Sequence, residues 1–363
     1  MKAFITGGTG FIGGHVMTKL LERGYDVHAL VRSEQDAVAF QAAGVHPVRG
    51  DILNLDSMRA GLRGSDVVFH IAGWYKVGAR DKSKAYAVNV DGTRNVLGLA
   101  HELRVPKIIY TSTVAVYGDT EGQLVDESYI MPPYKKFLTE YDRTKWMAHY
   151  EIAEPMIRNG APVTILLPGG VYGPADPSLV GSLMKLYYQG LMPIVPGPGF
   201  VFTYAHVEDV AEGHVLAAEH GKAGESYILA GPAASLGDMF DLWAFLLNRK
   251  PPSVRIPGSY LRALAPLVAM IENYVPLPEV LSAETLGILD ACYGARSEKA
   301  FRELGWRTRP VEDGMQETLE WISRRAQTIV LSPNERRRLA AFSLGAALVL
   351  MVLWLRKRVV DGD

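Results

Sequence analysis

The chain has 363 residues, of which 48% are hydrophobic and 21% charged, and its formal net charge is −1. This composition excludes an intrinsically disordered chain, and the length allows one large core or two smaller ones. The balanced charge gives no electrostatic reason to expect nucleic acid as a partner. The single cysteine, Cys292, excludes an internal disulfide framework and, with no Cys/His spacing near it, a structural zinc site. We therefore expect a globular protein of a reducing compartment with no metal site.

The first predicted element is a short apolar strand, Lys2–Thr6, which a glycine-rich turn connects to a helical pattern ending at Gly24. Such a turn brings a pyrophosphate close to the backbone, and the free N–H groups of the helix N-terminus attract that anion. The residues expected to contact a dinucleotide here are Gly7, Gly10, Phe11, Ile12 and Gly13. The alternative is a glycine-rich turn that has only a packing role and binds no dinucleotide.

The second predicted strand, residues 26–31, is followed by Arg32. Sheets that prefer NAD usually end this strand with Asp or Glu, which binds the ribose hydroxyls. Without that acid, the Arg32 guanidinium can bind a 2′-phosphate. The sequence therefore favours NADP(H) as cofactor and leaves NAD(H) as the alternative, in which Arg32 is an ordinary solvated charge and Glu34 reaches the ribose.

Further buried strands are predicted at residues 45–49, 67–71, 107–112 and 163–167. Asp51 and Ile52 are placed to flank the adenine, and Ala72 and Gly73 to approach the cofactor backbone, although all four could be turn residues. Strands that alternate with helix-sized segments predict an α/β fold, a doubly wound parallel sheet of the Rossmann type. Its ligands bind at the carboxyl ends of the strands.

Residues 141–145 read YDRTK, and Tyr141 is the only one of the 17 tyrosines with a lysine, Lys145, four residues later. On a helix the two side chains share one face, so a phenol and an ammonium can meet over one ligand. On spacing alone, the simpler interpretation is an amphipathic helix whose tyrosine packs and whose lysine is solvated.

Beyond about residue 174 the rhythm of strands and helices changes, with dense proline and glycine at 193–199 and a strongly apolar stretch at 260–281. We predict a nucleotide-binding domain over residues 1–174. A smaller substrate lobe, interleaved with the last sheet elements, follows over 175–330. Residues 331–363 are predicted to form a linker and a hydrophobic helix.

The C-terminal run from Leu339 to Leu355 is uncharged and lies between two basic clusters, residues 336–338 and 356–358. Its apolar residues go all the way round a helix, and its length is at the short end of what spans a bilayer. We expect a membrane anchor that leaves a cytoplasmic catalytic domain. A buried terminal helix and an oligomer contact are the alternatives.

Several motifs along the chain occur together in one known family: GGTGFIG at 7–13, GDI at 50–52, HIAG at 70–73, NVDGT at 89–93, TSTVAVYG at 111–118, YDRTK at 141–145 and PGGVYGP at 168–174. With this ordered set, residues 1 to about 325 resemble the extended short-chain dehydrogenase/reductases. Within them the chain looks most like the branch of dihydroflavonol reductases and 3β-hydroxysteroid dehydrogenases.

The resemblance implies roles for individual residues. Tyr141 would be the general acid/base, and Lys145 would hold the nicotinamide ribose and lower the pKa of the phenol. Thr113 would bind the substrate oxygen, with Ser112 less favoured because adjacent strand residues point to opposite faces. Asn89 and Pro168 would lie beside the cofactor. The family's ordinary assembly makes a homodimer an implication.

Two departures from the family pattern bear on the substrate. Thr113-Val114-Ala115 stands where sugar dehydratases carry Thr-Asp-Glu, and Phe202 stands where nucleotide-sugar enzymes carry an arginine that clamps the diphosphate. A sugar nucleotide then becomes improbable unless Lys185 or another cation compensates. We expect a ketone or alcohol of a hydrophobic sterol-, terpenoid- or lipid-like compound, with pocket walls among Trp74, Tyr75, Tyr172 and Met184.

Two other functions stay open from the sequence. One is an NAD-dependent nucleotide-sugar epimerase that uses the same tyrosine. The other is a cofactor-binding scaffold or redox sensor, against which the intact Thr113, Tyr141 and Lys145 set argues.

Overall fold

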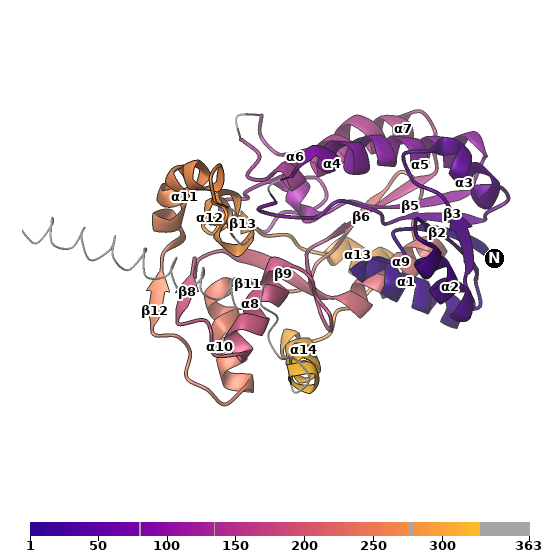
Figure 1. The fold of residues 1–363 in the computed structure, drawn as a ribbon. Helices are drawn as coiled ribbons and strands as arrows, with labels where there is room; N and C mark the ends of the chain where they lie inside the picture. The colour runs from indigo at the N-terminus through magenta and orange to yellow at the C-terminus, as the bar shows by residue number, and fades with distance from the viewer. Residues whose placement is uncertain (80, 134, 276, 278, 327–363) are drawn as a thin grey trace, which may run out of the picture.

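The computed structural model of the chain describes residues 1–79, 81–133, 135–275, 277 and 279–326. Its centre is a 7-stranded parallel sheet with the order β10-β6-β5-β4-β1-β2-β3. The strands are β1 Lys2–Thr6, β2 Asp26–Val31, β3 His46–Arg49, β4 Val67–His70, β5 Lys107–Thr111, β6 Val163–Pro168 and β10 Ser226–Leu229. The predicted doubly wound sheet of the Rossmann type is confirmed (Figure 1).

The strands are unbroken apolar runs because helices cover both faces of the sheet. Ala3, Phe4 and Ile5 in β1 are fully buried, as are Ile165 and Leu166 in β6. The predicted bounds of β1 and β2 agree with the structure, whereas β4 and β5 each end one residue earlier than we expected.

Helices form a layer on each face of this sheet (Figure 1). One layer contains α1 Phe11–Glu22, α2 Glu34–Ala42 and α9 Val207–His220. The other contains α3 Leu55–Leu62, α4 Ser83–Tyr86, α5 Gly92–Glu102, α6 Glu140–Trp146 and α7 Glu154–Arg158, with the π-helical turns Ala87–Asp91 and Met147–Ala153 between α4 and α5 and between α6 and α7. α1 ends where the sequence predicted, because Gly24 has a φ of +73° and donates its N–H to Leu21 O.

The second half of the chain builds a smaller lobe but returns to the main sheet through α9 and β10. The strands of the lobe are β7 Gly170–Tyr172, β8 Ile194–Pro196, β9 Val201–His206, β11 Ala233–Ser235, β12 Val254–Ile256 and β13 Cys292–Tyr293. The helices of this half are α8 Leu179–Tyr188, α10 Leu236–Leu246, α11 Gly258–Glu272, α12 Ala283–Ile288, α13 Glu298–Glu303 and α14 Val311–Ala326. Among these strands β9 is central, since it pairs with β7, β11 and β13.

Within the part of the chain that the structure describes, we find no helix with the length and apolar character needed to cross a bilayer. The hydrophobic helix predicted for Leu339 to Leu355 lies outside the described residues, so it stays a prediction.

Candidate active site

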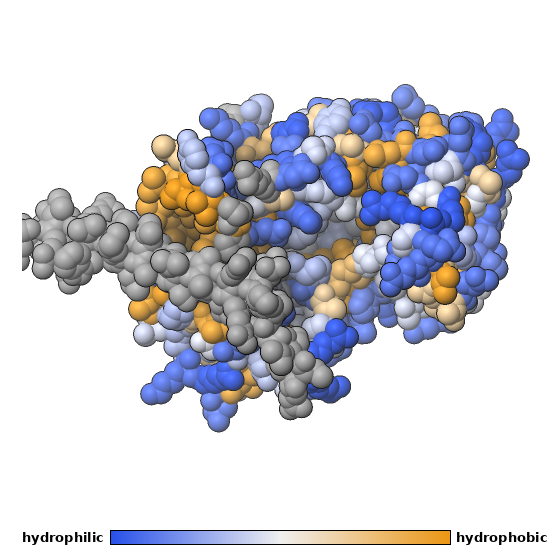
Figure 2. Space-filling view, viewed as in Figure 1, coloured by the Kyte–Doolittle hydropathy of each residue, from blue (hydrophilic) through white to orange (hydrophobic). Residues whose placement is uncertain are grey.

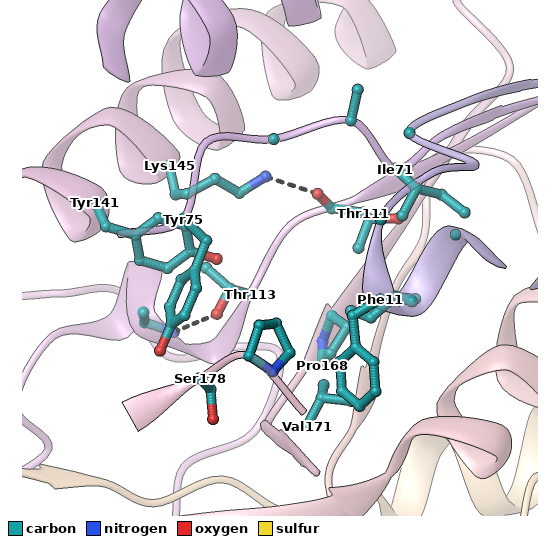
Figure 3. A pocket seen from close by; sticks show the side chains of 18 of the residues that line it. Phe11, Ile71, Tyr75, Thr111, Thr113, Tyr141, Lys145, Pro168, Val171 and Ser178 are labelled. Atoms are coloured by element: carbon teal, nitrogen blue, oxygen red, sulfur yellow. Dashed lines mark hydrogen bonds between the residues drawn. The ribbon is translucent and has the colours of Figure 1, made fainter. Parts of the chain in front are cut away.

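A cavity of about 800 Å³ lies between the carboxyl ends of the sheet strands and the smaller lobe. One end is lined by residues that follow β1 to β4, and the other by α6, β9 and β13. Figure 3 shows Phe11 and Pro168 on one side of this space and Tyr75, Thr113 and Tyr141 on the other. The site is therefore placed where parallel sheets bind ligands.

The glycine-rich turn between β1 and α1 lets neighbouring backbone segments, and a ligand, come close to its own backbone. A Cβ on Gly13 would lie 2.1 Å from Gly7 O, and Gly7 itself has a φ of +82° with its backbone against Ala72. No side chain caps the N-terminus of α1, which begins directly after Gly10. Free N–H groups and a bare backbone surface fit a pyrophosphate. All five residues predicted for this turn line the cavity, namely Gly7, Gly10, Phe11, Ile12 and Gly13.

The other residues predicted at the nucleotide end also line the cavity: Arg32, Asp51, Ile52, Ala72 and Gly73. Glu34 is not part of the lining, and its Oε2 lies 3.7 Å from Arg49 Nη1. Arg32 is exposed at the edge of the site, with Asp36 as the neighbouring acidic residue of the lining. Thus Arg32 lines the cavity just after β2, and Glu34 does not.

Tyr141, Lys145 and Thr113 meet at the middle of the cavity (Figure 3). The N-cap Thr139, whose Oγ1 accepts a hydrogen bond of 2.9 Å from Asp142 N, starts α6 just before Tyr141. The Thr113 side chain lies beside the Tyr141 phenol (Figure 3), and Thr113 Oγ1 accepts a hydrogen bond of 3.2 Å from Ala115 N. Lys145 Nζ donates to Thr111 O at 2.7 Å and to the Tyr110 hydroxyl at 3.3 Å. The hydroxyl pair and the ammonium therefore flank one space.

Burial controls the protonation of these groups. It raises the pKa of the Tyr141 phenol, an effect that the neighbouring Thr113 hydroxyl opposes. Burial also lowers the pKa of Lys145 to about 7. We expected Lys145 to lower the phenol pKa, but desolvation dominates in the structure and the ammonium is turned to the Thr111 carbonyl. Tyr141 is thus protonated at neutral pH and able to donate.

Ser112 and Thr113 both line the cavity, but their side chains have different neighbours. The alternation of strand residues does not apply to them, because β5 ends at Thr111. Ser112 Oγ is hydrogen-bonded to His149 Nδ1 at 2.9 Å. Thr113, and not Ser112, is therefore the hydroxyl that lies next to the Tyr141 phenol (Figure 3).

Asn89 is the predicted site residue that does not line the cavity. Its side chain is buried behind the wall, where Oδ1 accepts from Trp74 N at 2.7 Å and Nδ2 donates to Trp74 O and Thr144 Oγ1. It therefore fixes the loop after β4 against α6 and acts as a positioning residue. Pro168, at the end of β6, lines the cavity as predicted.

The substrate end of the cavity is walled by aromatic rings from the smaller lobe. Phe200, Phe202 and Tyr204 line it from β9 and the turn before it, and the Phe202 ring stacks on Tyr293 with centroids 5.0 Å apart. Of the predicted wall residues, Tyr75 and Tyr172 line the cavity, whereas Trp74 and Met184 do not. Lys185 is also absent from the lining, in which the basic residues among those described are Arg32, Lys84 and Lys145.

Sequence reasoning missed two acidic residues that join the lobes beside the catalytic helix. Asp142 is 3% exposed, and its Oδ2 accepts a hydrogen bond of 2.9 Å from the Tyr293 hydroxyl. Glu284 of α12 accepts from Gly78 N, Lys82 Nζ and Glu140 N. Their partners are remote in sequence, so no local pattern could have indicated them.

The chain was compared with known proteins. Residues 3–230 match the family model of the NAD dependent epimerase/dehydratase family. A ketoreductase of Stigmatella aurantiaca, named for 4-hydroxy-2-methyl-3-oxo-4-farnesyl-3,4-dihydroquinoline-1-oxide, is 31% identical over 85% of this chain and 92% of its own length. Sterol demethylase protein B of Methylococcus capsulatus is 27% identical over 90% of this chain and 99% of its own.

Among solved structures, the crystal structure of gox2253 is similar with a TM-score of 0.77 and 32% sequence identity, covering 90% of this chain and 98% of that one. The matched sheet, the glycine turn and the Tyr141, Lys145 and Thr113 constellation agree with the resemblance first drawn from the motifs. The chain belongs to the NAD dependent epimerase/dehydratase family and is an NAD(P)-dependent oxidoreductase of the extended short-chain dehydrogenase/reductase type.

Proposed function

We propose that the protein interconverts a ketone and a secondary alcohol on a hydrophobic, sterol-, terpenoid- or lipid-like substrate, with NADP(H) as the favoured cofactor. The observation that carries this proposal is the position of the Tyr141 and Thr113 hydroxyls. They face a cavity that has the glycine-rich turn after β1 at one end and the rings of Phe200, Phe202 and Tyr293 at the other.

The residues of the chain have different roles in the proposed reaction. A bound nicotinamide supplies the hydride in reduction and accepts it in oxidation. Thr113 fixes the substrate oxygen, and Tyr141 transfers its proton to that oxygen in reduction and takes it back in oxidation. Lys145, held by Thr111 O, would bind the nicotinamide ribose.

The cofactor preference is supported by Arg32, which lines the cavity after β2 while Glu34 faces Arg49. Arg32→Ala is expected to raise the KM for NADPH by about 10-fold or more while changing the KM for NADH little, because a charge-assisted bond to the 2′-phosphate is lost. Arg49→Ala, a neighbouring exposed cation outside the lining, is the control. A wild-type enzyme with higher catalytic efficiency for NADH would overturn the assignment of Arg32.

A hydrophobic substrate is supported by the cavity wall and by the names of two relatives, a sterol demethylase protein and a farnesyl-quinoline ketoreductase. The test is NADPH oxidation with a panel of sterol, terpenoid and aliphatic ketones beside UDP- and dTDP-sugars. Turnover confined to the nucleotide sugars would refute the proposed substrate class.

The second candidate is an NAD-dependent nucleotide-sugar epimerase, which the family description favours. This function predicts NAD that stays bound through purification and interconversion of sugar epimers without net consumption of cofactor. An enzyme that is isolated without nucleotide and consumes NADPH stoichiometrically excludes it.

The membrane anchor at Leu339 to Leu355, the cytoplasmic orientation of the catalytic part and the homodimer remain predictions from the sequence. Fractionation of the full-length chain tests the anchor, because a chain that stays in solution without detergent would contradict it.

A further inference from the structure

Helix α11 packs one side against the protein, and its two charged side chains are both paired with residues around α12. Arg262 Nη2 pairs with Asp290 Oδ2 at 2.6 Å, and Glu272 Oε1 accepts a hydrogen bond from Ala283 N at the start of α12. Leu261 on the same side is buried. An ordinary surface helix turns its apolar stripe to the core and its charges to water. In α11 both of its charged side chains are instead engaged by the loops around α12.

The outward side of α11 and of the turn after it is apolar. We call this surface the α11 stripe, and it consists of Leu267, Met270, Ile271, Tyr274 and Val275, which are 48%, 65%, 36%, 86% and 50% exposed. The spacing of three and four residues from Leu267 to Tyr274 places these side chains on one helix face. Figure 2 shows hydrophobic surface gathered over α11. Single exposed apolar residues are ordinary, whereas a contiguous stripe indicates an interaction surface.

We infer that the α11 stripe docks on the surface of a lipid bilayer. A helix with an uncharged apolar face and its charges on the opposite side lies in the plane of the membrane interface and inserts that face among the acyl chains. Tyr274 is the most exposed residue of the stripe, and tyrosine favours the level of the lipid headgroups. The charge-free composition argues against a charged partner.

The C-terminal part of the sequence also supports a lipid bilayer as the partner of the α11 stripe. The uncharged run from Leu339 to Leu355 has basic clusters on both sides, a pattern that suits lipid headgroups. Residues 327–338 can span at most about 40 Å, so a membrane-bound run would hold the described domain close to the bilayer. One weak interfacial contact gives marginal, reversible binding, and stable attachment needs two such signals.

Docking through α11 would also orient the cavity. α11 packs along α12, and Ile288 at the end of α12 lines the substrate end of the cavity. The α11 stripe is therefore linked through α12 to the substrate end of the cavity. The docking inference does not rest on the proposed reaction, because binding can be measured without substrate.

The native cysteine makes a direct test possible. Cys292 is 7% exposed, so a thiol-reactive fluorophore will label an added surface cysteine selectively. Full-length Met270→Cys and Tyr274→Cys are labelled with a polarity-sensitive fluorophore and reconstituted with vesicles of equal parts phosphatidylcholine and phosphatidylglycerol. Some of these vesicles contain lipids that carry a spin-label quencher on the acyl chain. Val38→Cys is the matched control, since Val38 is also an exposed apolar residue, 60% exposed, but lies on α2 of the nucleotide-binding half.

Docking predicts blue-shifted emission at positions 270 and 274 that lipid quencher reduces at least about 3-fold, with little quenching at position 38. Water-like, unquenched emission at 270 and 274 would overturn the inference. Blue-shifted but unquenched emission would overturn it as well. In that case a dependence on the ratio of protein to lipid would identify a second copy as the occupant, and independence from that ratio a segment of the same chain.

Discussion

At the scale of single residues, desolvation decides what the groups of the active site can do. Burial raises the pKa of Tyr141 and lowers that of Lys145 to about 7, so both groups favour their neutral forms. Burial also raises the pKa of Asp142, the next residue of the same helix, to about 7. Three titratable groups within five residues are therefore perturbed in the direction that removes charge, which is typical of functional sites.

The role of Tyr141 can be tested with Tyr141→Phe. The proposed mechanism uses the phenol as proton donor, so turnover should fall on the order of 100-fold or more. The binding of NADPH, measured by fluorescence titration, should change little because the ring is retained. Tyr75→Phe is the control, since the Tyr75 ring meets that of Tyr141 at 4.9 Å and also lines the cavity. Unchanged turnover in Tyr141→Phe would remove the phenol from the mechanism.

The buried carboxyl of Asp142 predicts a pH dependence of stability. In the unfolded chain this group loses its proton near pH 4, whereas burial in the fold holds the proton up to about pH 7. The folded state thus binds more protons in this window, and its stability falls as pH rises from about 4 to 7. Asp142→Asn removes this dependence, so the stability of the variant relative to wild type should rise by roughly 2–3 kcal/mol between pH 5 and pH 7.5.

Urea unfolding at pH 5 and pH 7.5 measures this difference, with Asp56→Asn at an exposed position as the control. The groups that face Asp142 are Thr139, Tyr293 and Glu284, and they are the same in both proteins. A relative stability that is constant with pH would show that Asp142 is ionised in the fold.

At the scale of elements, the nucleotide half could be predicted from sequence and the substrate half could not. Buried parallel strands are continuous apolar runs, and glycines mark the turn where backbone must approach backbone, so β1, β2 and the turn before α1 were evident. The walls from β9 and β13 depend on contacts between distant segments, such as Phe202 on Tyr293, which leave no local periodicity. Asn89 was misplaced for the same reason, because its partners Trp74 and Thr144 belong to other elements.

The glycine turn offers a test with an internal control on one helix. A Cβ on Gly13 would lie 2.1 Å from Gly7 O, whereas a Cβ on Gly14 would lie 3.6 Å from Gly8 O, an ordinary contact. Gly13→Ala is expected to destabilise the fold by about 1–3 kcal/mol through overpacking and to weaken NADPH binding. Gly14→Ala should leave binding unchanged and stabilise α1 by up to about 1 kcal/mol. Thermal unfolding and nucleotide titration distinguish the two, and equal effects would refute the close packing of this turn.

At the scale of the whole molecule, the site exists only where the two halves meet. The Asp142–Tyr293 hydrogen bond ties α6 to β13. Glu284 of α12 holds both Glu140 at the start of α6 and the loop at Gly78. These contacts fix the catalytic helix against the lobe that carries the aromatic wall. The aromatic wall therefore depends on how the two halves assemble, whereas Tyr141 and the glycine-rich turn belong to the first half alone.

The most direct test of the central claim follows deuterium from the cofactor to the product. The full-length protein is incubated with NADPH deuterated at C4 of the nicotinamide and with a hydrophobic ketone from the panel, and the product is analysed by mass spectrometry. We predict an alcohol with one deuterium at the carbinol carbon for each NADPH oxidised, and no such product with Tyr141→Phe. Absence of labelled alcohol from every ketone, together with interconversion of UDP-sugar epimers by bound NAD, would contradict it.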